Sequence, residues 1–148
     1  MQVFLGRSGV EYAAMRPLTV FLGRLLGLYT LIISLWLLAD KQEAVSTIPD
    51  MLGNRPLMVV IAIIAFVGGL AIILGHNIWT GGALPILVTL IGWIAFLRGL
   101  LFLFLPPAAT RQILEAIQFE RFFYIYVAIP LILGAYLSYL GFTARATR

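Results

Sequence analysis

The chain has 148 residues, of which 62% are hydrophobic and 11% charged, with a net charge of +4 and a mean hydropathy of +1.05. Soluble domains average about 45–50% apolar and about 25% charged residues, and a chain this short buries only about two-thirds of its surface. A soluble domain and a disordered chain are therefore excluded. The lack of cysteine excludes a disulfide scaffold and a thiol enzyme. The basic residues stand at segment ends, which indicates anchoring at lipid headgroups and no nucleic-acid partner.

Four apolar stretches are long enough to cross a bilayer, which takes about 20 helical residues. They cover residues 17–39, 56–75, 83–105 and 122–141. Their apolar runs are continuous and do not alternate, which predicts helices and not barrel strands. The first run is longer than the core of a signal peptide, so we expect an uncleaved anchor. The fold class expected is all-α, an integral membrane four-helix bundle that forms a single transmembrane domain over residues 1–148.

The polar segments between the spans differ in pattern. Residues 106–121 place apolar and polar side chains on opposite helical faces, with Thr110 as a candidate cap, which predicts a short amphipathic helix at the membrane interface. Residues 8–11 fit a capping box and predict another such helix. The segment 40–55 carries charges and the turn former Pro49, and it is interpreted as a linker.

A weak internal repeat is visible. Residues 38–75 and 105–141 share the order of helix end, polar linker, arginine, apolar helix and closing Leu-Gly, at an offset of 66–67 residues. Such a repeat would arrange the spans as two parallel helical hairpins about an axis along the membrane normal.

An even number of spans puts both termini on one side. Lys and Arg divide five against five between the two sides, so the positive-inside rule barely discriminates. Arg7, Arg16 and Arg24 precede or begin the first span, and five of the six acids fall on the other side. We therefore expect both termini in the cytoplasm.

Arg24 and Arg98 lie about two turns inside their spans. An arginine in hydrocarbon is costly unless it reaches the headgroups or pairs with another group, and no span contains an acid. Arg98 either extends to the headgroup layer or forms a site for an anion or a lipid headgroup, and it is our first candidate functional residue.

His76 is the only histidine, and Asn77 follows it at the end of the second apolar stretch. A metal site needs three or four ligands, so we expect no metal and no cofactor. The two side chains, with the turn at Gly81-Gly82, are interpreted first as a polar cap that reverses the chain. A proton-sensing or substrate-contacting role for His76 is the alternative.

Thr89 and Trp93 share a face of the third stretch. Trp93 lies near mid-span, away from the interface where tryptophan usually sits, so it either fills the core or lines a cavity. Trp79, near a span end, is typical of the interfacial belt.

Small residues mark candidate helix-packing faces, because helices in lipid associate where their backbones approach closely. The candidates are Gly23 and Gly27 in the first stretch, Gly69 with Ala65 in the second and Gly99 with Ala95 in the third.

The residues from Gly75 to Pro106 resemble a family of small uncharacterised bacterial inner-membrane proteins. The pattern is H-N-x-W, then T-x-x-G-W, then a basic residue followed by glycine, then proline, and it spans about 30 residues here. The resemblance implies bacterial origin, location in the inner membrane, four spans and interest in six positions: His76, Asn77, Trp79, Thr89, Trp93 and Arg98. It implies no activity.

No catalytic triad, phosphate-binding glycine loop or pair of carboxylates within a span is present, so we expect that the chain is not an enzyme. The leading hypothesis is a structural or accessory membrane protein that forms a homo-oligomer or joins a membrane-protein partner. The first alternative is an oligomeric channel or transporter for a small anionic or neutral solute, built around the stretch from Thr89 to Arg98. The second is a lipid- or quinone-binding subunit.

Overall fold

The computed structural model describes residues 17–144. Within that range the chain forms six helices and no strand: α1 (Pro17–Ala39), α2 (Lys41–Gly53), α3 (Arg55–Gly75), α4 (Ala83–Phe104), α5 (Pro107–Ala116) and α6 (Phe123–Thr143). Helices α1, α3, α4 and α6 are long and apolar enough to cross a membrane, which confirms an all-helical chain with four candidate spans. Their ends lie within two residues of the predicted ones. The capping box at 8–11 lies outside the described residues.

Helix α2 is a correction, because residues 40–55 were interpreted as a linker. The side chain of Asp40 accepts a hydrogen bond from the backbone N–H of Glu43 at 3.0 Å and starts the helix. The side chain of Asn54 accepts one from Leu57 at 3.2 Å and starts α3 directly afterwards. These two caps satisfy N–H groups that each helix start leaves open, and Pro49 is accommodated inside α2.

Helix α5 forms in the segment predicted to be amphipathic, but it begins at Pro107. Thr110 therefore lies inside the helix and is not its cap. Proline suits the first helical position because its φ angle is already helical and the N–H it lacks would have no partner there. After the helix the chain turns at Gln118, whose φ is 49°.

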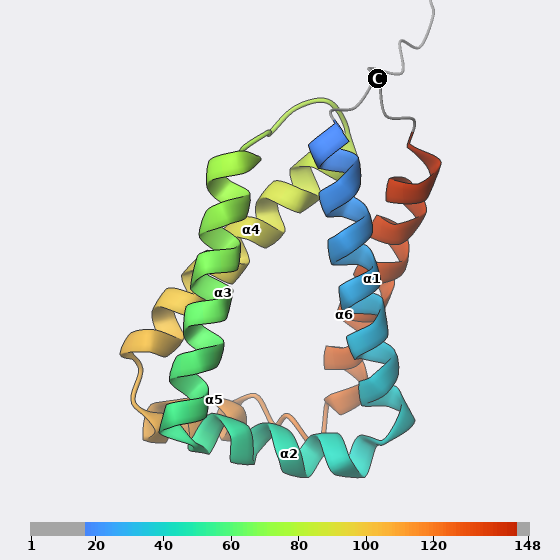
Figure 1. Ribbon diagram of the computed structural model, residues 1–148. Helices are drawn as coiled ribbons and strands as arrows, with labels where there is room; N and C mark the ends of the chain where they lie inside the picture. Colours follow the sequence, from blue (N-terminus) through green and yellow to red (C-terminus); the bar gives the residue numbers. More distant parts are fainter. Residues whose placement is uncertain (1–16, 145–148) are drawn as a thin grey trace, which may run out of the picture.

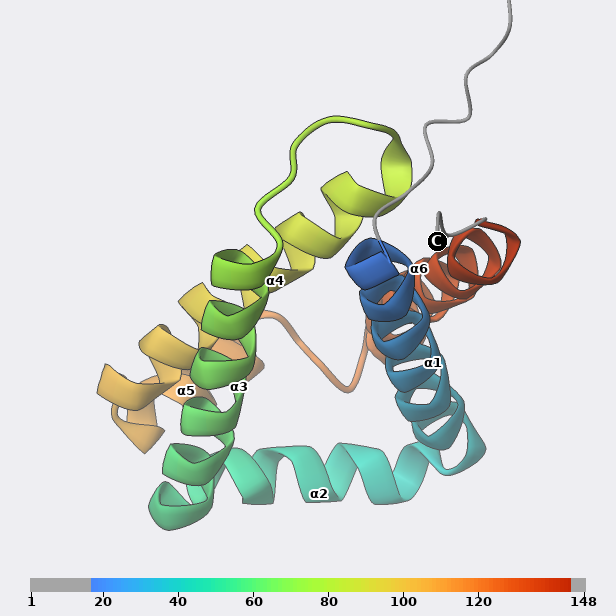
Figure 2. The same ribbon diagram turned by 45° about the horizontal axis from the view of Figure 1, so that its top comes forward.

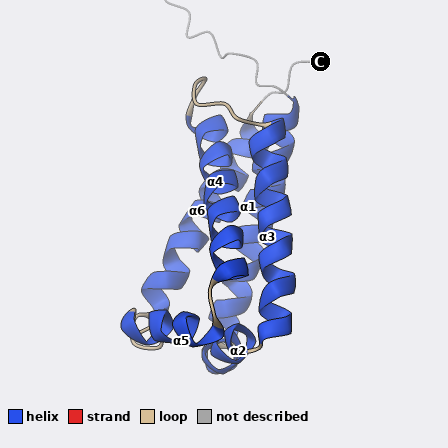
Figure 3. Ribbon diagram, turned by 90° about the vertical axis from the view of Figure 1, so that its left-hand side faces the viewer, coloured by secondary structure: helices blue, strands red, loops and turns tan. Residues whose placement is uncertain are grey.

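The four long helices form two antiparallel pairs, α1 with α6 and α3 with α4. The pairs approach each other at the end that carries the α3–α4 loop and spread apart toward the other end, which gives the triangular outline of Figure 1. Helix α2 runs from the foot of α1 to the foot of α3 (Figure 2), and both α2 and α5 cross the open end of the long helices (Figure 3).

Close backbone contact holds α3 against α4. A Cβ atom placed on Gly69 would collide with the backbone nitrogen of Phe96 and lie 2.8 Å from the carbonyl oxygen of Gly92. A Cβ on Gly99 would collide in the same way with the backbone of Phe66. Neither position has room for a side chain, because the helix axes approach more closely than a larger residue allows.

The pair of α1 and α6 is built alike. A Cβ on Gly134 would lie 2.7 Å from the backbone nitrogen of Leu31, and one on Gly27 would lie 2.6 Å from that of Ser138. Gly23 differs, since its nearest neighbour is the side chain of Leu84 on α4. Gly23 and Gly27 therefore pack within one chain.

The two halves of the fold repeat with an offset of 65 residues. The buried positions of α1 and α3 recur 65 places later in α4 and α6. In α1 they are Thr19, Val20, Gly23, Gly27 and Ser34, which match Leu84, Pro85, Val88, Gly92 and Gly99. In α3 they are Met58, Ala62 and Gly69, which match Phe123, Val127 and Gly134.

This offset corrects the 66–67 taken from the order of features. The helix pairs also differ from the two hairpins expected from the sequence, in which the two helices of each pair would belong to the same half of the chain. Each antiparallel pair combines a helix of the first half, residues 17–75, with a helix of the second, residues 83–143. The closest helix–helix contacts of the fold therefore join one half of the chain to the other.

Candidate functional site

Two polar residues of the sequence-predicted set are fully buried: His76, which follows α3 and is 1% exposed, and Thr89 on α4, which is 0% exposed. The Nε2 atom of His76 lies 2.8 Å from the hydroxyl of Thr19 in the first turn of α1, and its Nδ1 lies 3.3 Å from the hydroxyl of Thr89. Both threonines are buried. The histidine therefore connects α1, α3 and α4 where the two helix pairs approach each other.

Thr89 also anchors the backbone after α3. Its hydroxyl accepts a hydrogen bond from the N–H of Ile78 at 3.1 Å. It lies 2.9 Å from the carbonyl oxygen of Ile78 and 3.2 Å from that of His76, and it can donate to either. A neutral His76 ring protonated on Nδ1 fits this set, because it donates to Thr89 and accepts from Thr19. Buried polar groups that are satisfied in this way favour a single arrangement.

Asn77 and Trp79 do not join this cluster. The indole N–H of Trp79 donates to the side-chain oxygen of Asn77 at 2.7 Å, and the tryptophan is 52% exposed. Two glycines complete the loop, Gly81 with φ 89° and Gly82 with φ 112°. Because other residues rarely adopt such φ values, the reversal depends on glycine there.

Trp93 lies one turn beyond Thr89 on α4. Its ring meets that of Phe96 edge to face, with centroids 6.1 Å apart and an interplanar angle of 84°. The indole Nε1 is buried and has no hydrogen-bond partner within residues 17–144. The Oγ atom of Ser138, which lies against Gly27, is likewise buried and has no hydrogen-bond partner within residues 17–144.

Arg98 lies away from the histidine cluster. Nine residues separate it from Thr89, which is about 13.5 Å along the helix and half a turn around it. Its side chain is exposed, and its guanidinium lies 5.1 Å from the ring centroid of Phe102. The structure thus brings His76 and Thr89 together and leaves Arg98 outside their site.

Sequence reasoning missed Thr19 as the partner of His76. The only signal was a hydroxyl in the first turn of a mostly apolar span. It also missed that Arg24 Nε donates to the carbonyl oxygen of Gly141 at 2.8 Å, with its guanidinium 5.1 Å from the ring centroid of Phe142. That contact is the repeat counterpart of the hydrogen bond from Thr89 to the carbonyl of His76.

The geometry of the cluster suits a structural connection. Its hydroxyl and imidazole groups face one another and the backbone, and the described residues contain no group of three side chains able to hold a metal. Comparisons with protein-family models, curated proteins and solved structures found no match.

Proposed function

We propose that the chain is a non-enzymatic, multi-pass protein of the bacterial inner membrane that acts as a structural or accessory component by associating with a second copy of itself. The four apolar helices support the membrane location. The hydrogen bonds of His76 to two buried threonines support a structural role for that residue, since its ring is engaged within the chain.

The outward face of α3 carries the proposal of self-association. Of the four spans, this helix has the highest mean hydropathy, 3.1, and the smallest fraction of residues buried inside the protein, 17%. A Cβ on Gly68 would meet nothing within 4 Å, whereas a Cβ on its neighbour Gly69 would collide with the backbone of α4. Ala71 and Gly75 continue the exposed small-residue face. In a bilayer, such a face allows close approach of another helix.

The test is the mass of the protein in nanodiscs and in mild detergent. We expect wild type to be larger than a monomer and Gly68→Leu to shift toward the monomer without loss of helicity. Ile63→Ala, which is exposed on the same helix but lies about 140° around it from Gly68, is the matched control and should keep the wild-type mass. A monomeric wild type, or a Gly68→Leu variant with unchanged mass, would count against self-association through α3.

The same proposal includes a single transmembrane bundle with α2 and α5 at the membrane interface and both termini in the cytoplasm. Helices α2 and α5 cross one end of the spans, as interfacial helices do (Figure 1). Because the chain has no cysteine, Ser46→Cys on the exposed surface of α2 provides a unique label. We expect an impermeant maleimide to label this cysteine in intact spheroplasts. Labelling only after the membrane is opened would indicate the opposite orientation, with both termini outside the cytoplasm.

A further inference from the structure

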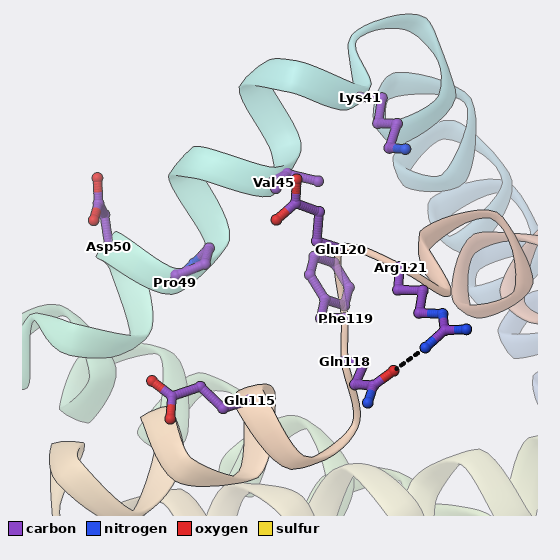
Figure 4. A pocket seen from close by; sticks show the side chains of 9 residues that line it. All are labelled: Lys41, Val45, Pro49, Asp50, Glu115, Gln118, Phe119, Glu120 and Arg121. Atoms are coloured by element: carbon purple, nitrogen blue, oxygen red, sulfur yellow. Dashed lines mark hydrogen bonds between the residues drawn. The ribbon is translucent and has the colours of Figure 1, made fainter.

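A cavity of about 1000 Å³ lies between α2 and the segment from α5 to the start of α6. Its volume is at the upper end of the range of about 300–1,000 Å³ that is typical of ligand sites. Val45, Pro49 and Phe119 give it an apolar wall (Figure 4). It lies at the open end of the spans, where the two helix pairs are spread apart.

Two cations line the end of the cavity near α6. The Lys41 Nζ atom lies 4.9 Å from the ring centroid of Tyr124 and 5.7 Å from that of Phe123. Arg121 donates to the side-chain oxygen of Gln118 at 3.3 Å. Figure 4 places both cations on the same side of the cavity. Contact with aromatic faces and an amide positions the charges but leaves them unneutralised.

Three carboxylates line the same cavity, namely Asp50, Glu115 and Glu120. Asp50 and Glu115 lie on the side away from Lys41 and Arg121 in Figure 4, and Glu120 lies between. Within residues 17–144, no ion pair joins any of these three carboxylates to Lys41 or Arg121. The site therefore offers separated positive and negative charge above an apolar wall.

We propose that this cavity holds the headgroup of a zwitterionic phospholipid. Lys41 and Arg121 bind the phosphate, and the carboxylates bind the ammonium group, as charge-assisted hydrogen bonds favour. The acyl chains lie along the apolar surfaces of the spread helix pairs. An anionic lipid fits less well, since sites for such lipids are basic and acids outnumber cations here by three to two. This inference is independent of the proposed self-association.

The test is native mass spectrometry of the full chain released from nanodiscs with equal palmitoyl-oleoyl phosphatidylethanolamine and phosphatidylglycerol. We expect the zwitterionic lipid to be retained at least about fivefold over the anionic one. The double variant Lys41→Gln/Arg121→Gln should lose this retention. Arg98→Gln is the control, because its charge is exposed outside the cavity, and it should behave as wild type.

A triple variant covers the case that the double variant fails to fold. Asp50→Asn/Glu115→Gln/Glu120→Gln should reverse the preference toward phosphatidylglycerol, which is a gain that misfolding does not produce. Glycerophosphoethanolamine, the headgroup without acyl chains, should not compete. Equal retention of both lipids by wild type, unchanged retention by the double variant, an unreversed triple variant, or competition by the soluble headgroup would each overturn the proposal.

Discussion

The hydroxyl of Thr19 lies 2.8 Å from Nε2 of His76, although 57 positions separate the two residues in the chain. The contact joins the start of α1 to the end of α3. Because both side chains are buried, replacing either one removes a hydrogen bond from the interior of the protein. A hydrogen bond in this place fixes how one helix pair meets the other.

Thr19→Val keeps the shape of the side chain and removes its hydroxyl. We expect a loss of about 1 kcal/mol of stability, which is the typical net contribution of one hydrogen bond, and a lower unfolding midpoint in detergent. Thr143→Val is the matched control, because that hydroxyl donates to the carbonyl of Tyr139 from an exposed position. Equal midpoints for the two variants would contradict a stabilising role for the contact with His76.

Gly69→Ala and Gly68→Ala form a second matched pair. The added methyl group at 69 would collide with the backbone of Phe96, and the one at 68 meets open space. We expect Gly69→Ala to cost about 1–3 kcal/mol through overpacking, and Gly68→Ala to be neutral or to stabilise by up to about 1 kcal/mol through helix propensity. Circular dichroism during thermal unfolding measures both, and similar effects at the two sites would argue against the observed contact of α3 with α4.

Gly27→Ala should be more damaging than Gly23→Ala. At 27 the nearest atom is the backbone nitrogen of Ser138, which cannot move without shifting α6. At 23 it is the end of the Leu84 side chain, which can change rotamer. We expect a difference of about 1–2 kcal/mol in unfolding free energy, read from unfolding in a denaturing detergent. A more damaging Gly23→Ala would mean that α1 packs on α4 more rigidly than on α6.

Arg55 closes the far end of α4. Its two terminal nitrogens donate to the carbonyl oxygens of Leu105 at 2.6 Å and Leu103 at 3.1 Å, which helix ends otherwise leave unpaired. Arg55→Gln should cost about 1 kcal/mol, reduced by its exposure to solvent. Arg55→Lys should recover only part of this, because a single ammonium group lacks the planar fork. Full recovery in the unfolding midpoint would show that charge alone matters.

The spans were predictable because each depends on a local property. A run of about 20 apolar residues matches the hydrocarbon thickness wherever it stands in the chain, so α1, α3, α4 and α6 appear within two residues of their predicted ends. Helix α2 was missed since Pro49 suggested a turn, although the caps Asp40 and Asn54 were present in the sequence.

The partners of the helices were decided by the tertiary structure. Gly23, Gly27, Gly69 and Gly99 stood out as small residues, but their spacing carries no information on which helix fills the space they leave. Close approach depends on two backbones at once, and the residues that meet, such as Gly27 and Ser138, are more than 100 positions apart. The 65-residue repeat became visible only through burial, because most matched positions differ in residue type and only the pairs of Gly27 with Gly92 and Gly69 with Gly134 are identical.

For the candidate site residues, too, the sequence predicted the elements on which they lie, and the tertiary structure decided which of them meet. Composition and hydropathy settle that the chain contains four membrane-length helices, because the transfer of side chains from water to hydrocarbon is a sum over neighbours in sequence. Which polar groups meet is a matter of three-dimensional distance: the fold unites His76 with Thr89 and Thr19 and leaves Arg98 on the far face of α4. A hydrogen bond acts only within about 3 Å, and in this protein the packing of the helix pairs sets those distances.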